Sequence, residues 1–149
     1  MAGSNEPPQA NTISMHASTV AIAGKAVVIR GASGSGKSSL ALQLMSLGAH
    51  LIADDRTVVE RSSEARLIAS CPSTIRGQIE ARGIGILAAD PAPPCIISLV
   101  VDLDQIESER LPHRHKTEIL GVLVECIHKS DSPHFAAAVL QYASGVRLA

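Results

Sequence analysis

The sequence predicts a mixed α/β fold in which strands outnumber helices. Three observations predict this class: two β-branched runs joined by a short turn, one helical run after a stretch of glycine and serine, and a long apolar run at 95–103. β-Branched residues favour strands, whereas apolar residues spaced three and four apart favour a helix. Because neighbouring strands can be joined both by a turn and by a helix, we expect a mixed sheet.

The first elements are strands at 18–23 and 26–31, with Gly24-Lys25 as a hairpin turn between them. The charged segment 104–118 interrupts the strand pattern, so we expect an exposed connection there. Short apolar or alternating runs predict the remaining strands. These strands are expected at 50–55, 57–60, 65–70 and 95–103.

Two helices are predicted. Leucines recur with helical spacing over 37–47, and Gly48 follows where a helix end favours a left-handed residue. A second helix is expected over 131–143, with Ser132 as N-cap and Pro133 in the first turn.

Length and composition predict one domain. A chain of 149 residues can bury most of a core without disulfides or metals. Residues 1–12 (MAGSNEPPQANT) are polar and contain paired prolines, so we expect a flexible tail there and a single domain over 13–149.

Composition also argues against several function classes. The net charge is −1, and there is one phenylalanine and one tyrosine, so the chain lacks a basic or aromatic surface for nucleic acid. No apolar run approaches the roughly 18 residues that cross a bilayer. Three widely spaced cysteines form no C-x-x-C pair, which favours a reducing compartment. We therefore expect a cytoplasmic protein without nucleic-acid or membrane partners.

A phosphate-binding motif lies between the predicted strand and helix. Residues 31–38 read GASGSGKS and match the pattern G-x-x-x-x-G-K-[ST]. Backbone N–H groups of such a loop wrap phosphates, its lysine reaches the β- and γ-phosphates, and its serine binds Mg²⁺. The sequence therefore predicts a nucleoside triphosphate site. Its candidate binding residues are Gly31, Ala32, Ser33, Gly34, Ser35, Gly36, Lys37, Ser38 and Ser39.

An aspartate pair, Asp54-Asp55, follows the strand after this helix. A strand-helix-strand unit returns these carboxylates toward the phosphates. Adjacent side chains of an extended chain point to opposite sides, so the two can serve different purposes. One can hold Mg²⁺ while the other accepts a proton from an attacking hydroxyl.

Two further segments complete a pattern. The stretch 79-IEARGIGIL-87 contains a glutamate before an R-G-x-G core, and His16 lies fifteen residues before Gly31. Together with the loop and 51-LIADD-55, these segments resemble the catalytic domain of HPr kinase/phosphorylase. The resemblance covers residues 14–103. In this stretch the sequence resembles the short proteobacterial form, which has no N-terminal domain.

The resemblance implies an ATP- and Mg²⁺-dependent serine kinase that phosphorylates an HPr-like phosphocarrier of the phosphotransferase system and dephosphorylates it by phosphorolysis. It also implies a homo-oligomer, with a hexamer as one form. By position, Asp54 becomes the general base, Arg82 shapes the site and His16 positions Asp54 or the phosphates. The implied catalytic residues are Asp54, Lys37, His16 and Arg82. The implied metal ligands are Ser38, Asp55 and Glu80.

The sequence departs from the family after residue 110. Long members carry a basic loop whose arginine serves dephosphorylation, and no residue here matches it; Arg110, Arg114 and Lys129 are candidates that spacing does not separate. The pair His113 and His115 lacks a third metal ligand in sequence, so we assign it to the charged loop.

Two other functions stay open. A small-molecule kinase with a phosphate loop would need an arginine-bearing lid, and neither Arg61 nor Arg66 lies in an evident one. A nucleotide-sensing module that never turns over ATP would not need Lys37, Ser38 and both aspartates intact. A GTP switch is disfavoured because the chain has no N-K-x-D motif.

Overall fold

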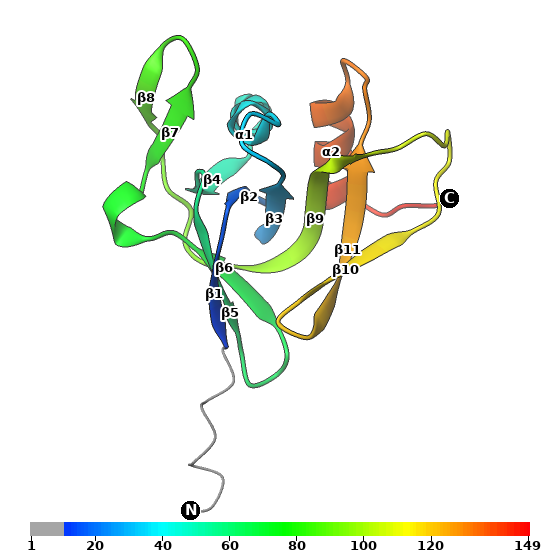
Figure 1. Ribbon diagram of the computed structural model, residues 1–149, viewed down its shortest axis with the longest axis horizontal. Coiled ribbons are helices and arrows are strands. Elements are labelled where there is room, and N and C mark those ends of the chain that lie inside the picture. Colours follow the sequence, from blue (N-terminus) through cyan, green and yellow to red (C-terminus); the bar gives the residue numbers. More distant parts are fainter. Residues whose placement is uncertain (1–10) are drawn as a thin grey trace, which may run out of the picture.

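The structure, a computed structural model, describes residues 11–149, so nearly all of the predicted tail at 1–12 lies outside the described residues. Strands predominate and two α-helices accompany them in this part of the chain (Figure 1), which confirms the predicted mixed α/β class. The sheet begins at Thr12, the last residue that we assigned to the tail. No helix within 11–149 is both long and apolar enough to cross a bilayer.

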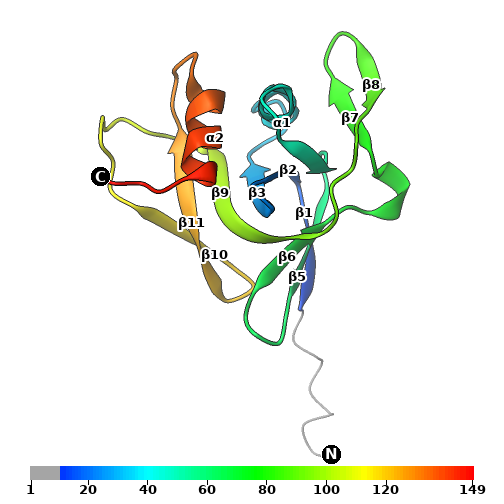
Figure 2. The ribbon, with the colours of Figure 1, turned by 180° about the vertical axis from the view of Figure 1, so that it is seen from behind.

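The main sheet is mixed, as predicted. Its strand order is β1-β5-β6-β9-β3-β2-β4, and β11, which pairs with β10, also joins β9 (Figure 2). β3 and β9 are parallel, whereas β2 and β3 form an antiparallel hairpin. A separate ribbon contains β7 and β8. The strands are β1 (Thr12–Met15), β2 (Ala17–Ile22), β3 (Lys25–Arg30), β4 (His50–Ala53), β5 (Thr57–Arg61), β6 (Leu67–Ser70), β7 (Gln78–Ala81), β8 (Gly85–Ala88), β9 (Cys95–Ile106), β10 (His115–Ile119) and β11 (Val122–Lys129).

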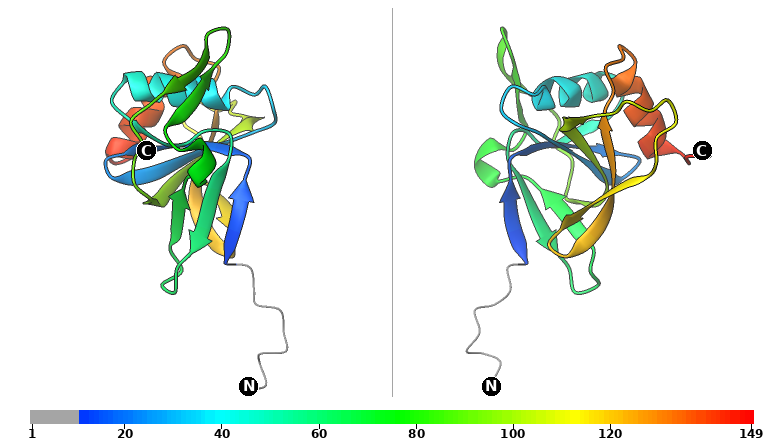
Figure 3. Two further views of the ribbon diagram at one scale, coloured as in Figure 1. Left: turned by 90° about the vertical axis from the view of Figure 1, so that its left-hand side faces the viewer. Right: turned by 45° about the vertical axis from the view of Figure 1, so that its right-hand side comes forward.

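The core lies on both faces of β3 and β9. Val27 and Ile29 belong to an apolar cluster with the helices, whereas Ala26 and Val28 face the strands around β5, β6 and β11. Figure 3 shows both helices gathered on one side of the molecule and β1, β5 and β6 on the other. Burial on both faces explains why β3 is a continuous apolar run rather than an alternating one.

Helix α1 (Lys37–Ser46) follows the prediction closely. Gly48 adopts φ 111°, its N–H donates to the Met45 carbonyl, and the Ala49 N–H donates to the Leu44 carbonyl. This pair of bonds is the Schellman arrangement, which satisfies the last carbonyls of a helix. The helix end therefore returns the chain directly into β4.

We expect the substitution Ile29→Val to lower the free energy of unfolding by about 0.5–1.5 kcal/mol, because it leaves a small cavity in a packed core. Ile29 is fully buried, two residues before the first residue of the phosphate loop. The matched control Ile84→Val changes an exposed side chain and should stay within about 0.5 kcal/mol. Urea unfolding of both variants measures the difference; equal effects would contradict the burial of Ile29.

Two local predictions about connections were wrong. The connection expected over 104–118 is confined to 107–114, because β9 runs to Ile106 and β10 begins at His115. The residues of β10 (HKTEI) alternate between partly buried and exposed until buried Ile119, and their charges concealed this strand periodicity. The β2–β3 turn comprises Ala23 and Gly24, both with positive φ, rather than Gly24-Lys25.

Helix α2 (Phe135–Ser144) begins later than predicted. Its N-cap is His134, which makes no capping side-chain bond. Ser132 Oγ instead accepts the N–H of His134 at 3.3 Å, ahead of the helix. Ser132 and Pro133 therefore lie in the connection before α2 and not in its first turn.

Candidate functional site

The phosphate loop connects β3 to α1 in a conformation that requires glycine. Gly36, the N-cap of α1, has φ 102°, a left-handed value that side chains disfavour. A Cβ at Gly31 would lie 2.5 Å from Ser35 Oγ, so the loop closes tightly only without a side chain there. The loop therefore presents the N-terminus of α1, with its unpaired N–H groups and positive dipole end, to the surface.

An open cavity of about 260 Å³ lies at this helix N-terminus. Its walls combine the predicted phosphate loop with residues from two distant segments, the end of β4 and the β7–β8 ribbon. The lining residues are Ser33, Gly34, Gly36, Lys37, Ser38, Ser39, Asp55, Glu80 and Arg82. Most of the residues predicted from separate motifs therefore lie around one space.

Three predicted loop residues do not line the cavity. The Ala32 N–H donates to both carboxylate oxygens of Asp104, at 3.0 and 3.1 Å. Gly31 packs against Ser35, whose buried Oγ has no hydrogen-bond partner among the described residues. Asp104, which lies on β9, was missed because only the parallel β3–β9 pairing brings it to the loop.

Lys37 is almost fully buried beneath the loop, with 5% of its surface exposed. Its Nζ donates to the carbonyls of Gly31 and Ala32, at 2.9 and 3.1 Å. Neutral carbonyls satisfy these hydrogen bonds without pairing the charge, so an anion at the helix N-terminus would gain a full cation beside it.

Asp54 is buried and accepts three hydrogen bonds. Its Oδ1 accepts the hydroxyls of Ser18 and Ser38, at 2.8 and 2.6 Å, and its Oδ2 accepts the backbone N–H of Glu80 at 2.9 Å. The first aspartate of the pair is thus joined directly to the last residue of the phosphate-loop motif. It also fixes the ribbon that carries Glu80.

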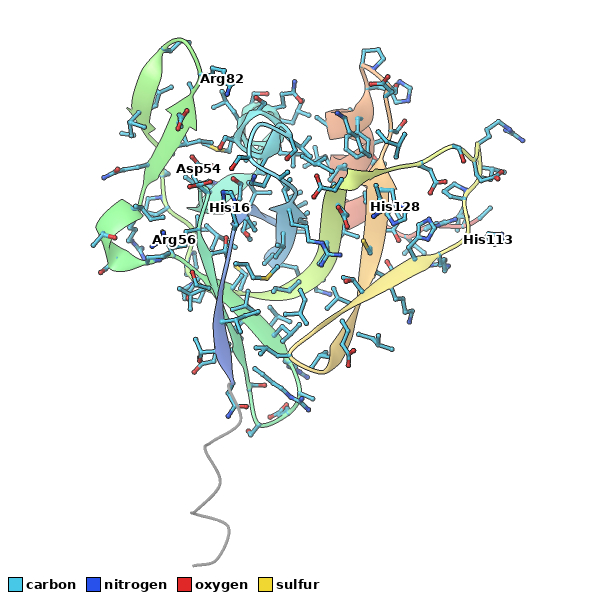
Figure 4. All side chains as sticks on the ribbon, viewed as in Figure 1. His16, Asp54, Arg56, Arg82, His113 and His128 are labelled. Carbon is cyan, nitrogen blue, oxygen red and sulfur yellow. The ribbon has the colours of Figure 1, made fainter. Side chains whose placement is uncertain are left out.

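Asp55 points elsewhere. Its φ of 65° is unusual for a residue with a side chain, and its carboxylate has a different partner from that of Asp54. The side chain is 71% exposed, and its Oδ1 lies 2.7 Å from His16 Nε2. His16 therefore pairs with the second aspartate, and Figure 4 shows it close to Asp54 at the base of the site.

The β7–β8 ribbon forms the outer wall. It holds Glu80 and Arg82, and Figure 4 shows Arg82 high on this ribbon, above Asp54. A second cavity adjoins the first on the other side of the aspartates, so Asp55 and Glu80 face both spaces. Its lining residues are Asp54, Asp55, Arg56, Pro72, Thr74, Ile75, Gln78, Glu80 and Ile86.

The three downstream cations lie in different settings. Arg114 forms an ion pair with Glu125 at 2.9 Å. Lys129 lines a hollow behind the phosphate loop together with Ser35 and Gly36. Arg110 is exposed in the connection between β9 and β10. Of the three, Lys129 is the one that borders the loop.

The cysteines carry no sign of activation. Cys71, Cys95 and Cys126 are free thiols, and burial raises the pKa of each. Because the thiolate is the nucleophilic form, a raised pKa works against reactivity at neutral pH. The chemistry of the site therefore rests on oxygen and nitrogen groups.

Comparison with known proteins gives consistent matches. The model of the HPr Serine kinase C-terminal domain family matches residues 8–129. The HPr kinase/phosphorylase of Limosilactobacillus reuteri is 38% identical over 123 residues, which cover 74% of this chain and 38% of that protein. The HPr kinase/phosphorylase of Aromatoleum aromaticum is 39% identical over 125 residues, which cover 75% of this chain and 40% of that protein. This chain thus spans well under half the length of these curated relatives.

A solved structure is also similar. The Hpr(Ser) kinase/phosphatase from Coxiella burnetii superposes with a TM-score of 0.71 at 26% identity. The match covers 86% of this chain and 91% of that chain. The strand-rich mixed fold therefore recurs in a solved structure.

Proposed function

The chain belongs to the family of the HPr Serine kinase C-terminal domain, and on this premise we propose that residues 13–149 form a protein serine kinase domain with ATP as phosphoryl donor. The observation that carries the proposal is the contact between Ser38 and buried Asp54, with exposed Asp55 beside them. A phosphate loop, a metal-binding pair and an exposed carboxylate are the parts that phosphoryl transfer needs.

The helix N-terminus is the proposed phosphate site. The loop N–H groups bind the phosphates, and Lys37 turns from two loop carbonyls toward the β- and γ-phosphates. Arg82 lines the same cavity and adds a second cation on the opposite wall. This arrangement concentrates positive charge where charge develops during transfer.

The oxygen donors around Ser38 suit Mg²⁺. Ser38 Oγ and Asp54 Oδ1 lie 2.6 Å apart, and Glu80 lines the adjoining wall, which gives the hard oxygen set that this cation prefers. We assign Ser38, Asp54 and Glu80 to the metal. When bound there, Mg²⁺ supplies charge neutralisation to the phosphates.

This assignment reverses the roles that sequence position implied for the two aspartates. Asp54 is buried, accepts three hydrogen bonds and lines only the second cavity, so its carboxylate is more fully engaged than that of Asp55. Asp55 is exposed, borders both cavities and is oriented by His16. We therefore assign Asp55 as general base and His16 as its positioning residue.

The second cavity is the proposed place of the acceptor. It shares Asp55 with the phosphate cavity, so a serine hydroxyl held there can approach the γ-phosphate while its proton passes to the Asp55 carboxylate. The cavity is open and has apolar walls at Ile75 and Ile86, which suit a segment of a protein rather than an enclosed metabolite. An HPr-like phosphocarrier is the acceptor that the family suggests.

The same groups can serve the reverse reaction. Inorganic phosphate attacks the phosphorus of phosphoserine, the serine oxygen leaves, and protonated Asp55 returns its proton to that oxygen; the products are serine and pyrophosphate. Arg82 and Arg56, which line the two cavities, are the cations nearest to the attacking phosphate, whereas Lys129 borders only the hollow behind the loop. We also propose a cytoplasmic homo-oligomer, with a hexamer as one form, on the strength of the family alone.

Measurement of ADP release separates this function from the two alternatives. Mixed with ATP, Mg²⁺ and an HPr-like phosphocarrier, the chain should release ADP, and a phosphocarrier whose acceptor serine is replaced by alanine should stop the release. ADP release that depends on added small metabolites instead would support a small-molecule kinase. ATP binding without any ADP release would support a sensing module.

A further inference from the structure

Two histidines and a glutamate meet on the side of the sheet away from the site. One ligand atom from each of Glu107, His115 and His128 lies within 4.8 Å of the others. Figure 4 shows His128 on β11, well removed from His16, Asp54 and Arg82. The proposed kinase function uses none of these three side chains.

The backbone holds the three residues firmly. His115 is the first residue of β10 and pairs with Cys126 of β11, while His128 lies on β11 opposite Asp102 of β9. The Glu107 N–H donates to the Lys129 carbonyl at 2.8 Å, which attaches the end of β9 to the end of β11. Side chains on such rigid elements are well suited to a defined ligand set.

The side chains already face one another. Glu107 Oε1 lies 2.8 Å from His115 Nε2, with 15% and 31% of these side chains exposed. The rings of His115 and His128 stack with centroids 3.9 Å apart and planes 10° from parallel. Within 11–149, the ring nitrogens of His128 make no hydrogen bond, so this half-buried imidazole has an unused ligand atom.

We propose that Glu107, His115 and His128 form a second metal site, distinct from the nucleotide site, that takes Zn²⁺. Two imidazoles and one carboxylate are a common protein ligand set for zinc, with a water in the fourth position. Ligands about 2.0–2.1 Å from one tetrahedral ion lie about 3.4 Å apart. Because the lone pair of an imidazole lies in the ring plane, binding of one ion requires the stacked rings of His115 and His128 to turn out of parallel. Mg²⁺ is disfavoured because it prefers oxygen ligands throughout.

The position gives the site a structural consequence. Zinc there joins the ends of β9, β10 and β11 and closes the connection 107–114. Asp104, three residues before Glu107, accepts the Ala32 N–H of the phosphate loop. A metal that fixes the end of β9 therefore also steadies the carboxylate that supports this loop.

Zinc titration of the purified chain, after removal of metals with a chelator, tests the proposal. We expect one Zn²⁺ per chain, a higher melting temperature with Zn²⁺, and a tetrahedral visible spectrum when Co²⁺ replaces it. His128→Ala and Glu107→Gln should each weaken Zn²⁺ binding by more than about 100-fold, because loss even of outer-shell partners costs about 10- to 100-fold. Glu107→Gln keeps the side-chain size, so it still tests the ligand set if His128→Ala fails to fold.

The matched controls are His113→Ala and His16→Ala. His113 lies on the outer connection beside His115, and His16 lies at the kinase site, so both variants should bind Zn²⁺ like the unaltered chain (Figure 4). The proposal is overturned if the unaltered chain takes up no Zn²⁺. It is equally overturned if His16→Ala removes binding while His128→Ala and Glu107→Gln retain it.

Discussion

The substitution Lys37→Ala should lower kcat for phosphoryl transfer by about 10³-fold, the upper range for removal of one preorganised charge donor. Lys37 is the buried cation at the base of the phosphate loop, and its present partners are neutral carbonyls. Loss of its charge leaves the developing negative charge on the phosphates to the backbone and Arg82. The measurement is steady-state ADP release with a saturating phosphocarrier.

Two controls isolate the effect of this charge. Lys25→Ala removes a lysine that is exposed at the start of β3, and it should leave kcat unchanged. Circular dichroism and melting temperature establish that the Lys37 variant is folded, since an unsupported loop could collapse. If the folded Lys37 variant kept the kcat of the unaltered chain, the phosphate loop would have no part in phosphoryl transfer.

The substitution Asp55→Asn should lower kcat by about 10²–10⁴-fold, the range expected for loss of a general base. The amide has nearly the same shape but cannot accept the proton of the serine hydroxyl. ATP binding should persist, because Asp55 is exposed and bonds to His16 rather than to the phosphate loop. Transfer rates and ATP affinity, measured on the same preparation, test both expectations.

The matched variant Asp54→Asn distinguishes the two aspartates. Because Asp54 bonds to Ser38, its loss should raise the Mg²⁺ concentration needed for half-maximal rate by about 10- to 100-fold, so that excess Mg²⁺ restores part of the activity. Excess Mg²⁺ should not restore Asp55→Asn. The opposite pattern would make Asp54 the general base and Asp55 the metal ligand, as sequence position implied.

The sequence was sufficient for the parts of the site that depend on local pattern. The glycines and Lys37 of the phosphate loop follow from one motif, and the same motif fixes the strand before it and the helix after it. Glu80, Arg82 and His16 could be found because their motifs match a family. The structure places Lys37, Glu80 and Arg82 around one cavity, and His16 contacts that cavity's Asp55.

The division of labour between Asp54 and Asp55 could not be predicted, because it depends on the positive φ of Asp55 and on the distant Ser18 and His16. Asp104 reaches the loop only through the parallel pairing of β3 with β9. The cluster around His128 was missed for a similar reason.

That cluster gives no sequence signal. Its three ligands come from the residue after β9, the start of β10 and the end of β11, so their spacing along the chain matches no metal motif. We assigned the pair His113 and His115 to the charged loop, but the structure places His115 on β10, where it contacts Glu107 and His128. Charged residues in β10 also concealed the strand that brings them together.

The intact mass of an HPr-like phosphocarrier, measured after incubation with this chain, ATP and Mg²⁺, tests the central claim most directly. The account predicts a gain of one phosphate, mapped by fragmentation to a serine, which Lys37→Ala and Asp55→Asn abolish on the time scale of the unaltered chain. Inorganic phosphate added afterwards should remove the group and yield pyrophosphate. An unchanged mass, with ATP shown to bind the chain, would contradict the assignment as a protein serine kinase and leave the family likeness as one of fold alone.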